Sequence, residues 1–270
     1  MTLLTQHTSH GVTLHGDERR PGGVTFAFTE RAGGVSKGEF SSLNLAAHVG
    51  DSPDDVAENR RRACEALGFG HLAEGIVCLR QVHGTDVVVV RDSGEAAISA
   101  ARRAAEAGAD AVVCTARDVP VLVDVADCAP VVLVCEGGFA VIHSGWRGTL
   151  GEISGKALDV LADEAGCAPS EVLAYVGPHI QVEDYEVSAE LAAQFADHFG
   201  GHVLAGERHL SLAECIVETL SQHGVARESI AVSPLSTASE PERLFSFRAS
   251  SGACGRQGAL ACLVGEGGRS

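Results

Sequence analysis

The chain has 270 residues, of which 45% are hydrophobic and 21% charged, and its formal net charge is −16. This composition is typical of a globular protein with enough apolar side chains for a sizeable core. Proteins that bind nucleic acid need a basic face that neutralises phosphates, and an anionic membrane surface repels an acidic chain. We therefore expect neither a nucleic acid nor a membrane as a partner.

The sequence carries no pattern typical of export. The N-terminal stretch "MTLLTQHTSHG" has neither a basic leader nor a long apolar segment, which argues against a signal peptide. The longest central apolar run, residues 129–135, is too short to span a bilayer. The nine cysteines are irregularly spaced and include no CxxC pair. We interpret most of them as reduced core thiols and expect a cytoplasmic protein.

The N-terminal part of the chain predicts one strand, a long loop and one helix. Residues 24–28 (VTFAF) have the composition of a strand, and a loop rich in Gly and Ser follows them. Ser52 is a typical N-cap, and Pro53 fits the first helical position. Gly68 is a typical helix end. We therefore expect a helix between Ser52 and Gly68.

The middle of the chain is rich in predicted strands. Residues 76–92 predict two short strands on either side of a His-Gly turn, and residues 93–108 predict a helix inserted at the surface. Four further β-rich runs follow in close succession: 111–115, 121–125, 131–135 and 139–143.

The C-terminal part alternates between helices and a strand. The predicted elements are a helix over 149–166, a strand over 171–177, and helices over 188–199 and 211–224. Because the strands are grouped instead of alternating strictly with helices, we expect an α+β fold with mixed β-sheets sandwiched between helices in αββα layers. No linker rich in Pro, Gly or Ser divides the chain, so we expect a single domain over residues 1–270.

The stretch "VADCAPVVLVCEGGFAVIHSGWRG", residues 125–148, predicts a hairpin of two apolar runs. A turn over "EGG" would place residue 131 opposite His143, with Pro130 breaking the strand beside Cys128. Both Cys128 and His143 would then emerge at the same end of the hairpin. The pattern alone allows two interpretations: Cys128 and His143 are core residues that flank a turn, or they lie on two sides of one reaction site.

The residues after His143 favour a site. Gly145 and Gly148 allow a close approach of the backbone. A helix that begins at Thr149, with Arg147 beside it, would offer free N–H groups to an anion.

Five motifs occur in an order that is specific in combination: QVHGTDV (81–87), ADAVV (109–113), ADCAPV (126–131), HSGWRG (143–148) and YVGPHIQVEDYEV (175–187). With them the sequence resembles the laccase-domain family, first labelled multicopper polyphenol oxidases and now described as purine nucleoside phosphorylases with adenosine deaminase activity. Residues 28–53 and 244–256 also resemble the ends of that family, so the match covers nearly the whole chain.

The resemblance implies that His83, Cys128 and His143 are both the metal ligands and the catalytic residues. Two imidazoles and a thiolate suit zinc, and three protein ligands leave a fourth position open for water or substrate. Copper could occupy the same site as an adventitious or alternative metal. The implied enzyme is a zinc-dependent purine nucleoside phosphorylase that acts on adenosine, inosine and methylthioadenosine, with adenosine deaminase as a side activity. We expect a monomer or a homodimer.

Phosphorolysis requires phosphate, and a guanidinium can hold phosphate through two hydrogen bonds. The candidates are Arg31, Arg147 and Arg248, of which the resemblance favours Arg31 and Arg147. Asp127 could orient a ligand imidazole or contact the nucleoside, or it could be an exposed residue at a strand end. His48 could line the substrate pocket or be a structural histidine.

The sequence departs from the family pattern in three places. Ser144 replaces a small alanine, which is a harmless change, and Ser236 stands where a cysteine is common. The loop after residue 177 lacks the glycine-rich "GPAIG" pattern, which puts its substrate contacts in doubt. Tyr185, in the same loop, is interpreted as a core residue.

Three alternatives remain open on the sequence. A metal-free cysteine hydrolase would use Cys128 as nucleophile and His143 as base to cleave an amide. A copper-dependent polyphenol oxidase fits less well, because the 12 histidines form no HxH pair and Met1 is the only methionine that could serve as a weak axial ligand. A non-catalytic module would bind a purine without turnover.

Overall fold

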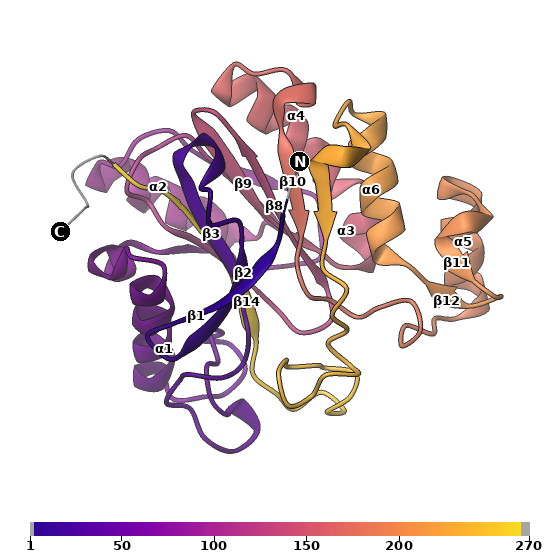
Figure 1. Cartoon of the computed structure of the whole chain (residues 1–270), viewed down its shortest axis with the longest axis horizontal. Coiled ribbons are helices and arrows are strands. Elements are labelled where there is room, and N and C mark those ends of the chain that lie inside the picture. The colour runs from indigo at the N-terminus through magenta and orange to yellow at the C-terminus, as the bar shows by residue number, and fades with distance from the viewer. Residues whose placement is uncertain (1–2, 266–270) are drawn as a thin grey trace.

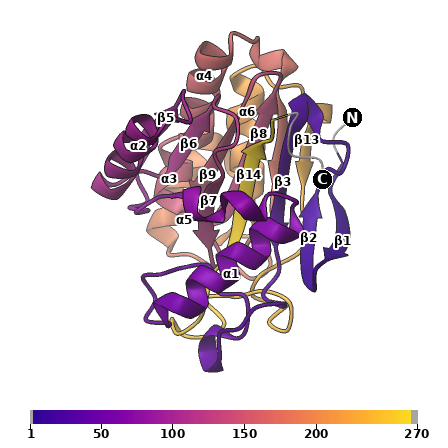
Figure 2. The same cartoon turned by 90° about the vertical axis from the view of Figure 1, so that its left-hand side faces the viewer.

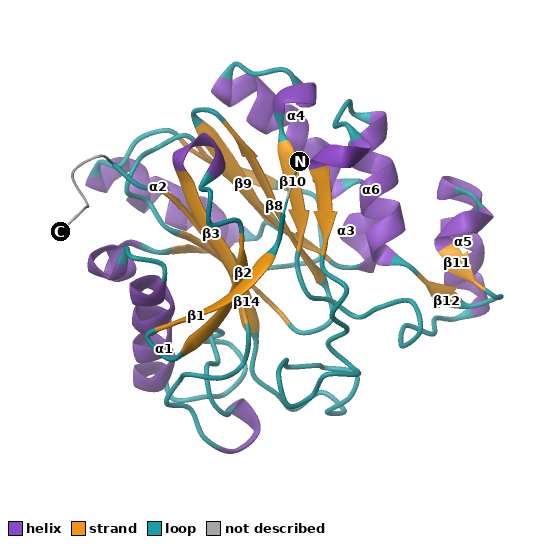
Figure 3. Ribbon diagram, viewed as in Figure 1, coloured by secondary structure: helices purple, strands orange, loops and turns teal. Residues whose placement is uncertain are grey.

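The strands of the chain form two large sheets that face each other, and helices cover their outer sides (Figures 1 and 3). The computed structural model describes residues 3–265. The predicted α+β class, with mixed sheets between helical layers, is confirmed. No helix within the described residues is long and apolar enough to cross a membrane.

The first sheet has six strands, and its neighbours are antiparallel except for the last pair, which is parallel. In spatial order they are β1 (Thr5–Ser9), β2 (Val12–Gly16), β3 (Val24–Thr29), β14 (Gln257–Leu263), β7 (Val121–Val125) and β4 (Val77–Cys78).

The second sheet also has six strands, and it is parallel at both edges and antiparallel in between. In spatial order they are β13 (Ile230–Val232), β10 (Leu173–Val176), β8 (Ala129–Cys135), β9 (Gly138–Ser144), β6 (Ala111–Cys114) and β5 (Val87–Val90). A separate two-stranded ribbon contains β11 (Leu204–Ala205) and β12 (His209–Leu210).

The core between the sheets explains why the central strands are almost uniformly apolar. Successive side chains of a strand point to opposite faces of its sheet. In β7, Val121 and Val123 therefore enter the core between the sheets, whereas Leu122 enters a second apolar cluster on the outer side. Because both faces of each central strand are covered, apolar residues occupy both sets of positions.

Helices close the outer sides of this sandwich (Figure 2). Helix α1 (Pro53–Ala66) contributes to the outer cluster of the first sheet, and the Ser52 side chain caps it as predicted by accepting a hydrogen bond from the Asp55 N–H. The second sheet is covered by α4 (Ile153–Ala165) and α6 (Leu212–Gln222). Helix α5 (Ala189–Phe199) packs in a separate apolar cluster beside the short ribbon.

The helix predicted as a surface insertion has a structural role. Helix α2 (Glu95–Ala107) packs against β4 at the edge of one sheet and β5 at the edge of the other. Its Ala101 and Ala105 side chains are buried in the core between the sheets. Most of α2 is exposed, as expected of a helix at the surface, but its small alanines let one face close one side of the sandwich.

The hairpin of β8 and β9 differs from the prediction by one residue. Its turn has two residues, Glu136 and Gly137, and Gly137 has a φ of 87° that favours glycine. Pro130, not residue 131, consequently faces His143. Pro130 also continues the strand instead of breaking it, and its carbonyl accepts a hydrogen bond from the Gly177 N–H.

The helix expected to begin at Thr149 starts earlier and is interrupted. Helix α3 (Trp146–Leu150) is short, and Glu152 precedes α4 with a left-handed φ of 59°. A residue in that conformation cannot continue a right-handed helix. The N–H groups at the start of α3 therefore belong to residues next to Gly145 and not to Thr149.

Candidate metal centre

Three residues from separate segments meet at one end of the sheets. His83 lies in the turn between β4 and β5, Cys128 directly precedes β8, and His143 is near the end of β9. Their donor atoms all lie within 4.8 Å of one another. The Cys128 Sγ atom is 3.8 Å from His83 Nε2, and the two imidazole centroids are 4.7 Å apart. The fold thus brings the complete predicted ligand set together.

This close packing depends on two glycines that leave no room for a side chain. A Cβ atom at Gly145 would lie 2.7 Å from His83 Cδ2 and 3.0 Å from Cys128 Sγ. A Cβ atom at Gly148 would lie 3.1 Å from the carbonyl oxygen of Gly84, in the same turn as His83. The close backbone approach predicted for these two glycines is confirmed.

A buried carboxylate, Asp110, contacts both histidines of this centre. Asp110, just before β6, is completely buried. Its Oδ1 atom lies 2.8 Å from His143 Nδ1 and accepts a hydrogen bond from the His83 N–H at 2.9 Å. The motif ADAVV singles out Asp110, but no local pattern could reveal partners that are 27 and 33 residues away.

The thiol of Cys128 and the imidazole of His143 each favour the charged form of the other. Burial alone would raise the pKa of Cys128, but the His143 charge and hydrogen bonds from both imidazoles lower it to about 6. Burial alone would lower the pKa of His143, but the Cys128 thiolate and the Asp110 carboxylate raise it well above its usual range. The protein matrix alone therefore favours a thiolate beside an imidazolium.

Asp127 has a different place from the one expected for a residue that orients an imidazole, because Asp110 fills that position. The Asp127 carboxylate accepts hydrogen bonds from the Thr237 hydroxyl at 2.6 Å and from the backbone N–H of Arg248 at 2.7 Å. Its backbone has a φ of 93°, a strained value for a residue other than glycine. Asp127 thus ties the backbone next to Cys128 to the C-terminal loop, and its contact with a nucleoside stays a prediction.

None of the three candidate arginines forms a salt bridge with a carboxylate among the described residues. Arg31 and Arg248 donate to backbone carbonyl oxygens, and the Arg147 guanidinium lies 4.6 Å from the centre of the Trp146 ring. Seven other arginines form salt bridges: Arg19, Arg61, Arg62, Arg91, Arg208, Arg227 and Arg243. The three candidates therefore offer charge that an anion could still use.

Two further side chains with expected roles, His48 and Tyr185, differ in their exposure to solvent. His48 is exposed, and its expected role in lining a substrate pocket stays a prediction. Tyr185 is only partly buried, and its ring centre lies 5.3 Å from the Arg248 guanidinium. Tyr185 therefore packs against the apolar cluster beside α5, in line with the prediction of a core residue, although part of its side chain stays accessible.

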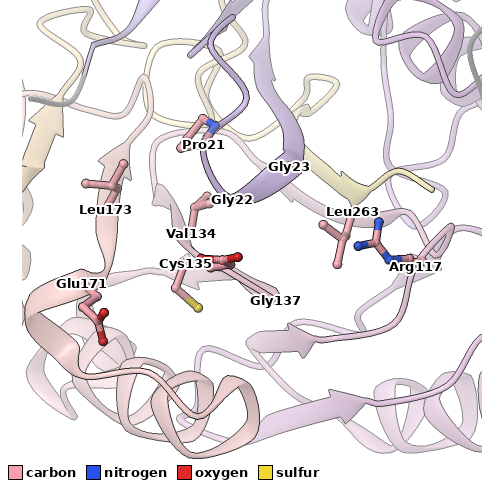
Figure 4. Close-up of a pocket in the computed structure, with 11 residues that line it drawn as sticks. Pro21, Gly22, Gly23, Arg117, Val134, Cys135, Gly137, Glu171, Leu173 and Leu263 are labelled. Atoms are coloured by element: carbon pink, nitrogen blue, oxygen red, sulfur yellow. The ribbon is translucent and has the colours of Figure 1, made fainter. Parts of the chain in front are cut away.

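None of these residues lines the cavity in Figure 4. It has a volume of about 610 Å³ and is lined by Cys135, Glu171 and Arg117, among others. Cys135 is at the opposite end of β8 from Cys128. The cavity contains none of the predicted site residues and no convergent set of imidazole and thiol groups, so we assign the chemistry to the centre around Cys128.

The donor set of this centre fits a transition metal. Nitrogen and sulfur donors suit zinc or copper, whereas magnesium and calcium take oxygen ligands. His143 and Cys128 are held close together by the protein, and the lowered pKa of the Cys128 thiol favours the thiolate that a metal requires. Among residues 3–265, this is the one group of three or more such side chains that could hold an ion.

A family model described as "Multi-copper polyphenol oxidoreductase laccase" matches residues 25–264. The chain belongs to this family. This laccase-domain protein is 36% identical over 242 residues to a purine nucleoside phosphorylase of Deinococcus radiodurans, covering 88% of each chain. It is 34% identical over 236 residues to the purine nucleoside phosphorylase YfiH of Escherichia coli, covering 85% of this chain and 90% of the relative.

The fold of this laccase-domain chain is also found in a solved structure. The crystal structure of YlmD from Geobacillus stearothermophilus matches it with a TM-score of 0.82 and 30% sequence identity, covering 96% of this chain and 98% of that one. The resemblance inferred from the five motifs is therefore confirmed over nearly the whole length.

Proposed function

We propose that the protein is a zinc-dependent purine nucleoside phosphorylase that acts on adenosine, inosine and methylthioadenosine and also deaminates adenosine. The convergence of His83, Cys128 and His143 carries the proposal, because three N and S ligands leave one position open on zinc. The names of the relatives from Deinococcus radiodurans and Escherichia coli support the phosphorylase activity. When bound, zinc supplies Lewis-acid catalysis and activates water.

The two reactions share a substrate and differ in the nucleophile. In phosphorolysis a phosphate oxygen attacks C1′ of the ribose, and the bond from C1′ to the purine nitrogen breaks. Its electron pair leaves with the base, which takes up a proton, and the products are the free purine and ribose-1-phosphate. In deamination the oxygen of water adds to C6 of adenosine, and the amino group leaves as ammonia to give inosine.

Only phosphorolysis needs a site for phosphate. Arg147 is close to the centre in sequence, two residues after Gly145, and is exposed with no carboxylate partner within the described residues. Arg31 and Arg248 are equally free of salt bridges there. We assign phosphate to Arg31 and Arg147, with Arg248 as a third candidate.

A chromatographic assay of adenosine, inosine, adenine and hypoxanthine, run with and without phosphate, tests the proposal. We expect adenine and ribose-1-phosphate only when phosphate is present, and some inosine in either case. The variant Cys128→Ala should lose all these products, because it removes a ligand and its charge. Wild-type, zinc-loaded protein that leaves every purine nucleoside unchanged would contradict the proposal.

The role of arginine has its own test. Arg147→Lys keeps the positive charge but loses the planar pair of donors. We expect the rate of phosphorolysis to fall more than the rate of deamination. Arg91→Lys is a matched control, because Arg91 is exposed and paired with Glu164. An equal fall of both rates in Arg147→Lys would assign Arg147 to the nucleoside or the zinc.

The lowered pKa of Cys128 favours a second candidate function, a metal-free cysteine hydrolase with His143 as base. Zinc content separates the two, since we propose about one zinc per chain and a hydrolase would keep working after chelation. Phenol oxidation that rises with bound copper would instead support the oxidase, and purine binding without turnover would support the binding module.

All nine cysteines are free thiols, which supports the proposed cytoplasmic location.

A further inference from the structure

The buried carboxylate of Asp110 links the two histidines of the metal centre. We propose that Asp110 is a positioning residue that holds the backbone of His83 and selects the tautomer of His143, so that both imidazoles are ready to bind a metal. This inference rests on the metal-binding part of the proposed function and is independent of the nucleoside chemistry.

Every polar atom of Asp110 contacts one of the two segments that carry the histidines. The carboxylate accepts hydrogen bonds from the three backbone N–H groups of residues 82–84, at distances of 3.3, 2.9 and 2.6 Å in chain order. Its backbone N–H donates to the Asp86 carbonyl at 3.1 Å, and its carbonyl accepts from the His143 N–H at 2.7 Å. Water does not compete for these bonds, because Asp110 has no exposed surface.

The contact with His143 determines which ring nitrogen is available to a metal. Oδ1 of Asp110 lies 2.8 Å from Nδ1 of His143. An ionised carboxylate can only accept a hydrogen bond, so Nδ1 must carry a proton. In the neutral imidazole, Nε2 then has the free lone pair that metal coordination needs. Asp110 therefore keeps His143 in the tautomer that can coordinate a metal through Nε2.

The contacts with residues 82–84 hold His83 in an unfavourable backbone conformation. His83 has a φ of 59°, in the left-handed region that favours glycine. This conformation is energetically costly for a residue with a side chain, because its Cβ atom crowds the backbone. Three consecutive N–H groups that point at one buried carboxylate can offset that cost, because hydrogen bonds to a charged group are stronger than neutral ones. These hydrogen bonds from Asp110 therefore stabilise the turn conformation that keeps the His83 ring beside Cys128.

Asparagine cannot replace Asp110 in this arrangement. The two carboxylate oxygens accept from four N–H groups, three in the backbone and one in an imidazole. An amide of the same size has one oxygen, and its NH₂ group must face either His143 or the backbone N–H groups of the turn. Facing His143, the NH₂ group would donate to Nδ1 and favour the tautomer with the proton on Nε2, which leaves Nε2 without a lone pair for the metal.

The variant Asp110→Asn tests the inference through zinc affinity, measured by competition with a chromophoric chelator in the absence of any nucleoside. We expect the affinity to fall about 10- to 100-fold, the usual effect of losing a partner of a ligand. Asp17→Asn is the matched control. Asp17 is also buried, with 4% exposure, but its carboxylate accepts from the Tyr175 hydroxyl and pairs with Arg19. It should destabilise the fold without changing zinc affinity.

A second measurement keeps the test decisive if Asp110→Asn does not fold. Nitrogen NMR shifts of His143 in zinc-loaded wild-type protein report which ring nitrogen carries the proton, and we expect it on Nδ1, beside Asp110, with Nε2 unprotonated. An Nε2-protonated ring, an unchanged zinc affinity in Asp110→Asn, or an equal loss of affinity in Asp17→Asn would each overturn the inference. Failure of the phosphorylase assay would leave these results unaffected, so the two proposals fail separately.

Discussion

Replacing Gly145 with alanine would add one methyl group between two proposed metal ligands. The backbone accepts the change, because Gly145 has a φ of −80°, a value that alanine adopts without strain. Space is the obstacle. The new Cβ atom would lie 2.7 Å from His83 Cδ2, and the ring would have to move by about 0.7 Å to reach an ordinary contact of 3.4 Å. The Cys128 Sγ atom, at 3.0 Å, would also have to move.

A displacement of this size matters more for metal binding than for folding. Distances in a working metal site are kept to within about 0.2 Å, so a shift of about 0.7 Å takes one ligand out of position. We expect Gly145→Ala to lower zinc affinity at least tenfold. Because Gly145 is the N-cap of α3, where alanine is less favourable than glycine, the free energy of unfolding should fall by about 1 kcal/mol or less.

Chelator competition measures the zinc affinity of Gly145→Ala, and urea unfolding of the metal-free protein measures its stability. Gly201→Ala is the matched control, since a Cβ atom there would meet nothing within 4 Å. It should leave zinc affinity unchanged. A zinc affinity of Gly145→Ala within twofold of the wild type would refute the reasoning that the ligands occupy the space a methyl group needs.

Two further outcomes follow from the same contacts. In metal-free protein, alkylation of Cys128 by iodoacetamide should stay fast down to about pH 6 and slow below it, because the lowered pKa keeps the thiol ionised above that pH. In the variant His143→Ala, the pH at which alkylation slows should rise. An unchanged pH profile would contradict the statement that His143 lowers the pKa of Cys128. Tyr175→Phe removes a buried hydrogen bond of 2.8 Å to the Asp17 carboxylate. It should lower the free energy of unfolding by about 1.5–3 kcal/mol in urea titrations while zinc affinity is kept, whereas a loss of zinc would mean that the two regions are coupled.

Several features of the fold could be predicted from the sequence because their causes are local. The helix after Ser52 was predictable from its cap, from Pro53 and from its apolar face. The two-sided burial of β8 and β9 was predictable from their apolar runs, whereas β7 is buried on both faces although it contains Asp124. In contrast, β14 (Gln257–Leu263) contains no β-branched residue, so propensity alone does not indicate that it lies at the centre of a sheet.

The sequence by itself determined the candidate ligands, His83, Cys128 and His143, because an imidazole or a thiol is recognisable wherever it stands and the five motifs mark these positions. Only the tertiary structure decided how they are held. The register of the hairpin depends on whether "EGG" forms a turn of two or three residues, and both turns satisfy the local pattern. The buried hydrogen bonds of Asp110 join segments 27 and 33 residues apart, and those of Asp127 reach 110 and 121 residues along the chain. Contacts at such separations depend on how the two sheets pack, and no pattern within one segment contains that information.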